Sequence, residues 1–339
     1  MKNNFQKSFI LLQVLTALSA CNSDNQKAHI ITKFPEKKEI EITAIETAPV
    51  ILAPEEMFIM NDQIWVFQSK KDTLFDVFEL PNCNYLFSTG RKGQGPDEFI
   101  FPIGKTIQTN DSGFTILDAN FIKFVSCQSN GALHITHSIK TFDHLAVNGF
   151  IRLNDSLVCA FTGCATGSSN DFEYQMKNLY SKKVIEFSSY PKLTTKEYEG
   201  EQRCQIYYKH LTANPNERKM AAFYSFFKYF RIYSYDGVLE KEGFVKIPPY
   251  KYQSENVEGW TKRKIYYGKP VATEKYIYVP CMGNEIQVWD WNGNPIIQFS
   301  LNQTFCTFAV SENRKKIYLI SANEDDYNKI FTFDISHLY

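Results

Sequence analysis

A two-strand pattern recurs six times along the chain, and this repeat constrains the fold more than any other feature. In each copy an apolar segment is followed by a polar connection and then by an aromatic-rich alternating segment. The apolar segments begin near Ile64, Phe114, Leu157, Met220, Tyr276 and Ile317. The alternating segments span residues 74–80, 121–127, 174–180, 229–235, 285–291 and 329–335. The apolar segments start 50, 43, 63, 56 and 41 residues apart, close to the spacing of roughly 40–50 residues between propeller blades.

The repeat predicts an all-β, six-bladed β-propeller over residues 39–339. One two-strand unit cannot bury both of its faces alone, so the units must pack side by side around an axis. The 339 residues are 44% apolar and 15% aromatic, enough for one large β domain, and no linker rich in Pro, Gly and Ser divides it. A two-sheet sandwich or a pair of smaller β domains is the alternative. We expect little helix.

The last copy lacks an outer strand, because the chain ends four residues after Ile335. Upstream of the first copy, residues 39–45 alternate between polar and apolar side chains with the period of a strand. We therefore predict that this N-terminal strand completes the last blade and closes the ring. Closure would also cover a sheet edge that otherwise invites aggregation.

The N-terminus has the pattern of an export signal. Lys2 and Lys7 precede an apolar run over residues 9–18, which is too short to span a membrane. The run ends in Leu-Ser-Ala-Cys, which resembles a bacterial lipobox and predicts that Cys21 is lipidated. A secreted protein with a chance cysteine is the alternative.

Residues 1–20 would then be a lipoprotein signal peptide, and the polar residues 21–38 a lipid-anchored flexible tether. We expect the protein in the cell envelope, at the outer rather than the inner membrane. Only Asp24 is acidic close after Cys21, so a periplasmic and a surface-facing domain both stay open.

Net charge argues against a nucleic-acid partner. The chain has 37 basic and 37 acidic residues, and no basic stripe gathers along it. We expect a monomer that touches the membrane only through its lipid anchor.

The segment 90–99, Gly-Arg-Lys-Gly-Gln-Gly-Pro-Asp-Glu-Phe, is unusual. It resembles the GRxGxGPxEF segment of the TolB-like six-bladed propeller lipoproteins of Bacteroidetes. Residues 276–279, 286–295 and 316–318 resemble the closing blades of the same family, and residues 219–237 also fit it. The likeness covers most of the mature chain and is poorest in the third copy. The resemblance implies a six-bladed propeller on a lipid anchor and says little about activity.

This segment has two interpretations. As a ligand loop, the glycines Gly90, Gly93 and Gly95, with Arg91 and Lys92, would cradle a phosphate or another anion through exposed backbone N–H groups. As a structural loop, the glycines would reverse the chain toward the next blade, and Glu98 would pair with Arg91 or accept backbone N–H bonds. No helix follows and no nucleotide-binding motif is complete, so we favour the structural interpretation.

No catalytic or metal site can be assembled from the sequence, and we expect no cofactor. A nucleophile elbow is absent. His134, His137 and His144 are the one cluster of histidines, and strand positions three apart point to opposite faces. Asp, Asn and Glu gather near strand ends at residues 61–62, 118, 154–155, 284–285 and 324–326. An axial calcium ion would use such ligands, but turn chemistry explains them more simply.

Seven cysteines remain after Cys21. Five lie in or beside strands, where a free cysteine usually packs as a small apolar side chain: Cys83, Cys127, Cys159, Cys281 and Cys306. Cys159 and Cys164 flank a short turn, and whether they form a disulfide is left open.

These features favour a non-catalytic envelope lipoprotein whose propeller is a binding or scaffolding module for a glycan, a peptide or a protein. The alternative is a calcium-dependent propeller hydrolase or lyase with its site on the central axis. A third hypothesis is an accessory subunit of an envelope uptake or signalling complex.

Overall fold

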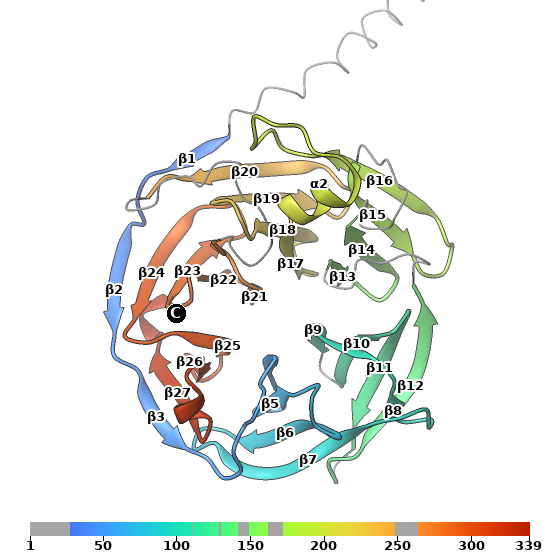
Figure 1. Ribbon diagram of the computed structural model, residues 1–339, viewed down its shortest axis with the longest axis vertical. Helices are drawn as coiled ribbons and strands as arrows, with labels where there is room; N and C mark the ends of the chain where they lie inside the picture. Colours follow the sequence, from blue (N-terminus) through green and yellow to red (C-terminus); the bar gives the residue numbers. More distant parts are fainter. Residues whose placement is uncertain (1–27, 111, 129, 142–148, 162–171, 248–263) are drawn as a thin grey trace, which may run out of the picture.

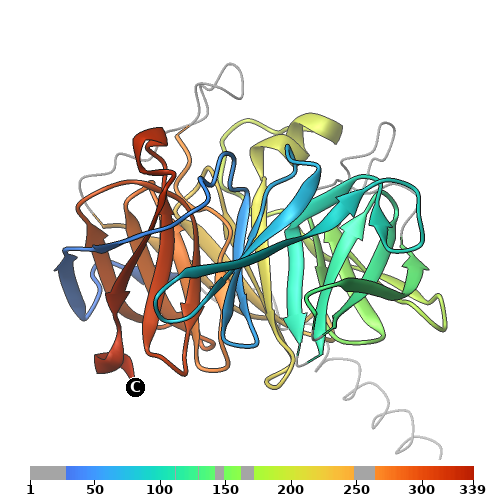
Figure 2. The same ribbon diagram turned by 90° about the horizontal axis from the view of Figure 1, so that it is seen from below.

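The computed structural model describes residues 28–110, 112–128, 130–141, 149–161, 172–247 and 264–339. These residues form six sheets arranged around a central axis (Figure 1). Seen from the side, the sheets stand next to one another in a disc (Figure 2). The predicted six-bladed propeller is confirmed, and the sandwich alternative is wrong.

Within each blade, the first strand lies next to the axis and later strands follow outward (Figure 1). Blade 1 contains β4 (Glu56–Met60), β5 (Gln63–Phe67), β6 (Thr73–Glu79), β7 (Asn84–Lys92) and β8 (Glu98–Phe99). Blade 2 contains β9 (Pro102–Asn110), β10 (Gly113–Asp118), β11 (Phe121–Cys127) and β12 (Leu133–Lys140). Blade 3 contains β13 (Phe150–Arg152), β14 (Leu157–Phe161), β15 (Phe172–Asn178) and β16 (Val184–Ser189).

The second half of the chain repeats this order. Blade 4 contains β17 (Lys209–Asn214), β18 (Lys219–Tyr224), β19 (Tyr229–Ser234) and β20 (Leu239–Val245). Blade 5 contains β21 (Val271–Ala272), β22 (Tyr276–Cys281), β23 (Glu285–Asp290) and β24 (Pro295–Leu301). Blade 6 contains β25 (Phe305–Ser311), β26 (Lys316–Ser321) and β27 (Lys329–Asp334), with the 3₁₀ turns η2 (Glu324–Asp326) and η3 (Ser336–Leu338).

Six apolar clusters form the core, one between each pair of neighbouring blades. Between blades 1 and 2, Phe75 packs on Phe114 with ring centroids 5.3 Å apart. Between blades 4 and 5, Phe230 packs on Trp289 at 4.9 Å. The second and third strands of each blade are covered on both faces, so they carry the apolar and aromatic segments that recur in the sequence.

An N-terminal segment wraps around the outside of three blades (Figure 1). β1 (His29–Ile31) pairs in parallel with β20 of blade 4, and β2 (Glu36–Ile40) pairs in parallel with β24 of blade 5. β3 (Thr43–Glu46) pairs antiparallel with β27 and is the fourth strand of blade 6. The predicted closure of the ring by an N-terminal strand is therefore confirmed. We call residues 29–46 the belt.

Two predicted boundaries near the N-terminus are wrong. The strand predicted over residues 39–45 breaks after Ile40, because the chain must turn there from the edge of blade 5 to blade 6. Much of the segment assigned to the tether, residues 29–38, lies in β1 and β2. Its polar composition is that of an exposed edge strand, since only Ile31 and Phe34 are buried there.

Helix is scarce, as predicted. Within the described ranges the one α-helix is α2 (Gly200–Ile206), which precedes β17 and packs Ile206 into the cluster between blades 3 and 4. No helix of the described chain is long and apolar enough to cross a membrane. The predicted signal peptide and Cys21 lie outside the described residues.

Candidate functional site

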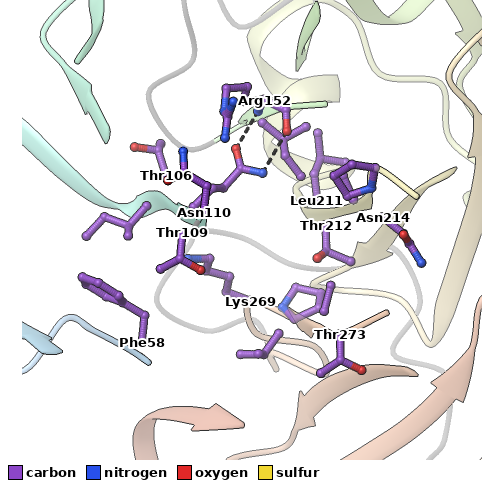
Figure 3. A pocket seen from close by; sticks show the side chains of 18 of the residues that line it. Phe58, Thr106, Thr109, Asn110, Arg152, Leu211, Thr212, Asn214, Lys269 and Thr273 are labelled. Atoms are coloured by element: carbon purple, nitrogen blue, oxygen red, sulfur yellow. Dashed lines mark hydrogen bonds between the residues drawn. The ribbon is translucent and has the colours of Figure 1, made fainter. Parts of the chain in front are cut away.

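A cavity of about 540 Å³ lies on the propeller axis, lined by the innermost strands β4, β9, β13, β17, β21 and β25 (Figure 3). A second cavity of about 470 Å³ shares Glu56, Lys105 and Lys269 with the first. We call the two together the axial channel. Their volumes fall in the usual range for small-ligand sites.

Hydroxyl and amide side chains line much of the axial channel. Thr109, Thr212 and Thr273 lie around it and come from three different blades (Figure 3). The hydroxyl of Thr273 donates to the Tyr276 carbonyl at 3.2 Å. No side-chain partner is described for the hydroxyls of Thr109 and Thr212, so both can bind a ligand.

Charged groups gather at one end of the channel, where β4, β17 and β21 begin. Lys269 Nζ lies 2.7 Å from Glu56 Oε1. Glu56 is only 7% exposed, and this burial raises the pKa of its carboxyl, although Lys269 and Lys105 oppose the shift. Lys105, on β9, is exposed to the channel and has no ion pair or hydrogen bond among the described residues. We call Glu56, Lys105, His210 and Lys269 the basic end.

His210 completes the basic end as a neutral side chain. It lies on β17, lines the axial channel and is 8% exposed. Burial, followed by the charges of Lys105 and Lys269, lowers the pKa of His210 to about 3. The ring therefore acts as a neutral hydrogen-bonding group at physiological pH rather than as a third cation.

At the far end of the inner strands the charged groups have polar partners. Arg152 Nη1 lies 2.8 Å from Asp155 Oδ1. Gln108 makes the two hydrogen bonds drawn at Arg152 in Figure 3, accepting from its N–H at 2.7 Å and donating to its carbonyl at 2.8 Å. Glu274 Oε1 accepts from Asn216 Nδ2 at 2.6 Å. This end is held by internal contacts.

A second group of buried charges lies between blades 3 and 4. The fully buried carboxylate of Glu173 contacts Lys209 Nζ, Arg231 Nη1 at 3.1 Å and the Tyr224 hydroxyl at 2.7 Å. The Lys209 ammonium also lies 4.8–5.1 Å from the centres of four aromatic rings, those of Phe161, Tyr174, Tyr190 and Tyr224. Each charge is satisfied inside the fold, so this cluster holds two blades together.

The Gly-rich segment at 90–99 does not line the axial channel. Glu98 Oε2 accepts a hydrogen bond from the Gly95 N–H at 2.9 Å. A Cβ added to Gly93 would lie 1.9 Å from the same oxygen, so the loop closes around its own carboxylate. Gly90 has φ +76°, which favours glycine, and Arg91 pairs with Glu98 through the parallel β7–β8 ladder rather than through a salt bridge.

This segment also connects blades 1 and 2. Asp97 Oδ1 accepts from the Ile135 N–H at 2.8 Å, and its other contact is His134 Nδ1 at 3.0 Å. Lys123 Nζ donates to the Glu98 carbonyl at 2.6 Å, and the ring of Phe99 is fully buried. These contacts support the structural interpretation of the segment. The Glu98 carboxylate occupies the position that a bound anion would take.

The acidic residues considered for an axial calcium site are dispersed. Asp62 pairs with Arg314, and Asp326 pairs with Lys329 at 2.9 Å. Asp118 accepts backbone N–H groups at the start of blade 2 and lies 2.5 Å from Lys123. In the part of the chain that the structure describes, no group of three or more His, Cys, Asp or Glu side chains could hold a metal ion.

The histidines and cysteines considered in the sequence analysis that the structure describes pack or pair within the fold. His137 stacks on Phe124 with ring centroids 4.0 Å apart, and His144 lies outside the described residues. Cys159 is free and buried in the cluster between blades 3 and 4, so the considered Cys159–Cys164 bridge is not formed. Cys204, on α2, is in a disulfide.

Sequence reasoning missed the basic end. Glu56 and Lys269 are 213 residues apart in the sequence. They meet only because the inner strands of blades 1 and 5 lie around the same axis. A weak signal existed: the first strand of each blade is more polar than the two that follow, as in Pro102–Asn110. In a propeller those strands face the axis.

Comparisons with known proteins agree with this architecture. A member of the DUF4221 family from Bacteroides vulgatus superposes with a TM-score of 0.54 at 11% identity, covering 88% of this chain and 96% of its own. A predicted exported protein of Bacteroides fragilis gives 0.55 at 12% identity, covering 90% and 98%. At these identities the likeness shows the fold alone.

No curated protein sequence matches the chain. The family profile described as "TolB-like 6-blade propeller-like" matches residues 33–313, which is most of the sequence. The chain therefore belongs to the TolB-like six-bladed propeller family.

Proposed function

We propose that the protein is a non-catalytic envelope lipoprotein that binds a glycan segment in its axial channel. The observation that carries the proposal is the ring of threonine side chains contributed by separate blades, two of which, Thr109 and Thr212, have no described side-chain partner. A few well-placed polar groups in a preformed cavity are what orient a hydroxyl-rich ligand.

The side chains of the channel support binding rather than catalysis. Within its described lining, no Ser, Thr or Cys side chain donates to a histidine or a carboxylate, the arrangement that activates a nucleophile. Thr106 donates to the Ile103 carbonyl at 2.7 Å and Cys306 to the Ile320 carbonyl at 3.4 Å. Glu56 is paired with Lys269.

The lipid anchor at Cys21 is part of the proposal, supported by the lipobox-like sequence and by the exported class of the Bacteroides fragilis neighbour. Expression of the full chain with radiolabelled palmitate tests it. Wild type should carry label and sediment with the membranes, whereas Cys21→Ser should carry none. Labelling that survives Cys21→Ser would contradict the anchor.

A substitution that fills the axial channel with a large side chain tests the binding site. Thr109 is exposed on β9 and makes no described side-chain hydrogen bond, so Thr109→Trp fills the channel without removing a contact. Thr43→Trp, on the exposed face of the belt, is the matched control. On an array of neutral and acidic oligosaccharides, wild type and Thr43→Trp should bind the same glycans, and Thr109→Trp should bind them at least tenfold more weakly.

Two results would overturn the proposal. Equal binding by Thr109→Trp and wild type would place the ligand elsewhere. Chromatographic detection of cleaved oligosaccharide, abolished by EDTA and restored by calcium, would instead support a calcium-dependent propeller hydrolase or lyase.

A further inference from the structure

We infer that the basic end of the axial channel binds a carboxylate of the ligand, so that the ligand is an acidic oligosaccharide containing uronic acid. This inference rests on the proposed function and names its ligand class. It begins from the geometry of Lys105, His210 and Lys269, which come from three blades and face one cavity. Two acids also line this cavity: Glu56, which pairs with Lys269, and Glu55.

Lys105 is the cation available to a ligand. Lys269 is committed to Glu56 at 2.7 Å, and these two charges cancel. Lys105 then has no described partner, although the two lysines and two glutamates of the cavity lining sum to zero charge. The second acid, Glu55, accepts from the Ser69 N–H at 3.2 Å and has no described contact with Lys105. A partly enclosed site strengthens the attraction of an anion to Lys105 relative to open water.

His210 supplies a neutral partner beside this cation. Its ring lines the same cavity, and no hydrogen bond to it is described. Burial is the main reason that the pKa of His210 is lowered, and the nearby charges of Lys105 and Lys269 lower it further. A carboxylate can therefore accept from the Lys105 ammonium and from a ring N–H at once, and charge-assisted bonds of this kind are the strong ones.

The remaining wall of the channel indicates what carries the carboxylate. The cavity with Thr109 and Thr212 shares Glu56, Lys105 and Lys269 with the cavity that contains His210. A ligand that reaches both must present hydroxyls and an acid within one small molecule. Uronic acid oligosaccharides do so, because each sugar carries both hydroxyls and a carboxylate.

Calorimetry with defined oligosaccharides tests the inference. The probes are trigalacturonate and trimannuronate, each with its methyl ester, which removes the charge and keeps the sugar. Binding to the full chain should be at least tenfold tighter for one acid than for its ester. Lys105→Met should erase this preference, while Lys92→Met, which removes a lysine from the outer strand β7, should keep it.

The outcomes separate this inference from the proposed function. If neither acid binds, if acid and ester bind equally, or if Lys105→Met keeps the preference, the inference is overturned. Tighter binding of triglutamate than of either uronate also overturns it. Should neutral sugars bind wild type but not Thr109→Trp, the proposed function stands without the acidic ligand. Should Thr109→Trp bind like wild type, both fail.

Discussion

Between blades 3 and 4 three buried charges satisfy one another, whereas at the basic end of the axial channel one cation is left without a partner. Glu173 is contacted by Lys209 and Arg231 at a fully buried interface. Lys105 faces a cavity, and none of the described residues pairs with it. In the first arrangement the charges pair with one another and join two blades. In the second, the Lys105 ammonium is unpaired among the described residues and available to a ligand in the channel.

This difference gives a criterion for function in a fold that hosts many activities. Charged groups in enclosed surroundings occur both at the blade 3–4 interface and at the basic end. Burial and charge therefore do not distinguish a ligand-binding site from a structural contact. The distinguishing property is whether the polar groups are already satisfied by the protein. By this criterion the Gly-rich segment is also structural, because the Glu98 carboxylate takes the place in the loop where an anion would bind.

The largest expected effect is on stability at the blade 3–4 interface. Lys209→Met removes one partner from the buried Glu173 carboxylate, and breaking a buried pair in this way costs about 3–5 kcal/mol. Urea denaturation followed by tryptophan fluorescence measures it. Lys105→Met is the matched control and should change the free energy of unfolding by less than about 0.5 kcal/mol, because no described contact is lost. Equal losses in the two variants would show that the Lys209–Glu173 pair adds no more stability than the unpaired Lys105.

Acidification should act on the basic end through His210. The pKa of His210 is lowered to about 3 in the fold, so the unfolded chain takes up this proton first as the pH falls below its ordinary value of 6.5. Stability is present above pH 6.5 and is lost toward pH 3, by at most about 1.4 kcal/mol per pH unit. His210→Gln should flatten this slope in urea denaturation between pH 6.5 and 4. An unchanged slope would mean that the ring is not held neutral.

Glu56 should show a smaller effect of opposite sign. Burial raises the pKa of Glu56 above its unfolded value, so the fold favours its protonated form. Its contribution to stability is therefore full below the unfolded pKa and is lost as the pH rises through the folded one. Relative to Glu56→Gln, wild type should lose stability as the pH rises above the ordinary pKa of 4.5. A gain over that range would show that pairing with Lys269 outweighs burial.

The fold could be predicted because its signals are local. The segments that recur in the sequence are the second and third strands of each blade, which are buried on both faces and therefore read as apolar runs, as in Tyr276–Cys281 and Lys316–Ser321. Closure by Thr43–Glu46 followed from a missing outer strand. His29–Ile31 and Glu36–Ile40 were missed because exposed edge strands look like a polar linker.

The site could not be predicted in the same way. The channel is lined by residues from six separate inner strands, and no spacing along the chain relates Lys105 to His210 or Lys269. Their meeting depends on the number of blades and on which face of each inner strand turns to the axis. The Gly-rich segment drew attention because its composition is unusual, yet composition does not reveal that Glu98 fills the loop.

A crystal structure of the full chain with the oligosaccharide that binds best would show where the ligand lies. We expect sugar density on the axis, with ligand oxygens within hydrogen-bonding distance of Thr109 and Thr212 and a carboxylate on Lys105 Nζ. Density on the outer strands or the belt, with an empty axial channel, would contradict this expectation.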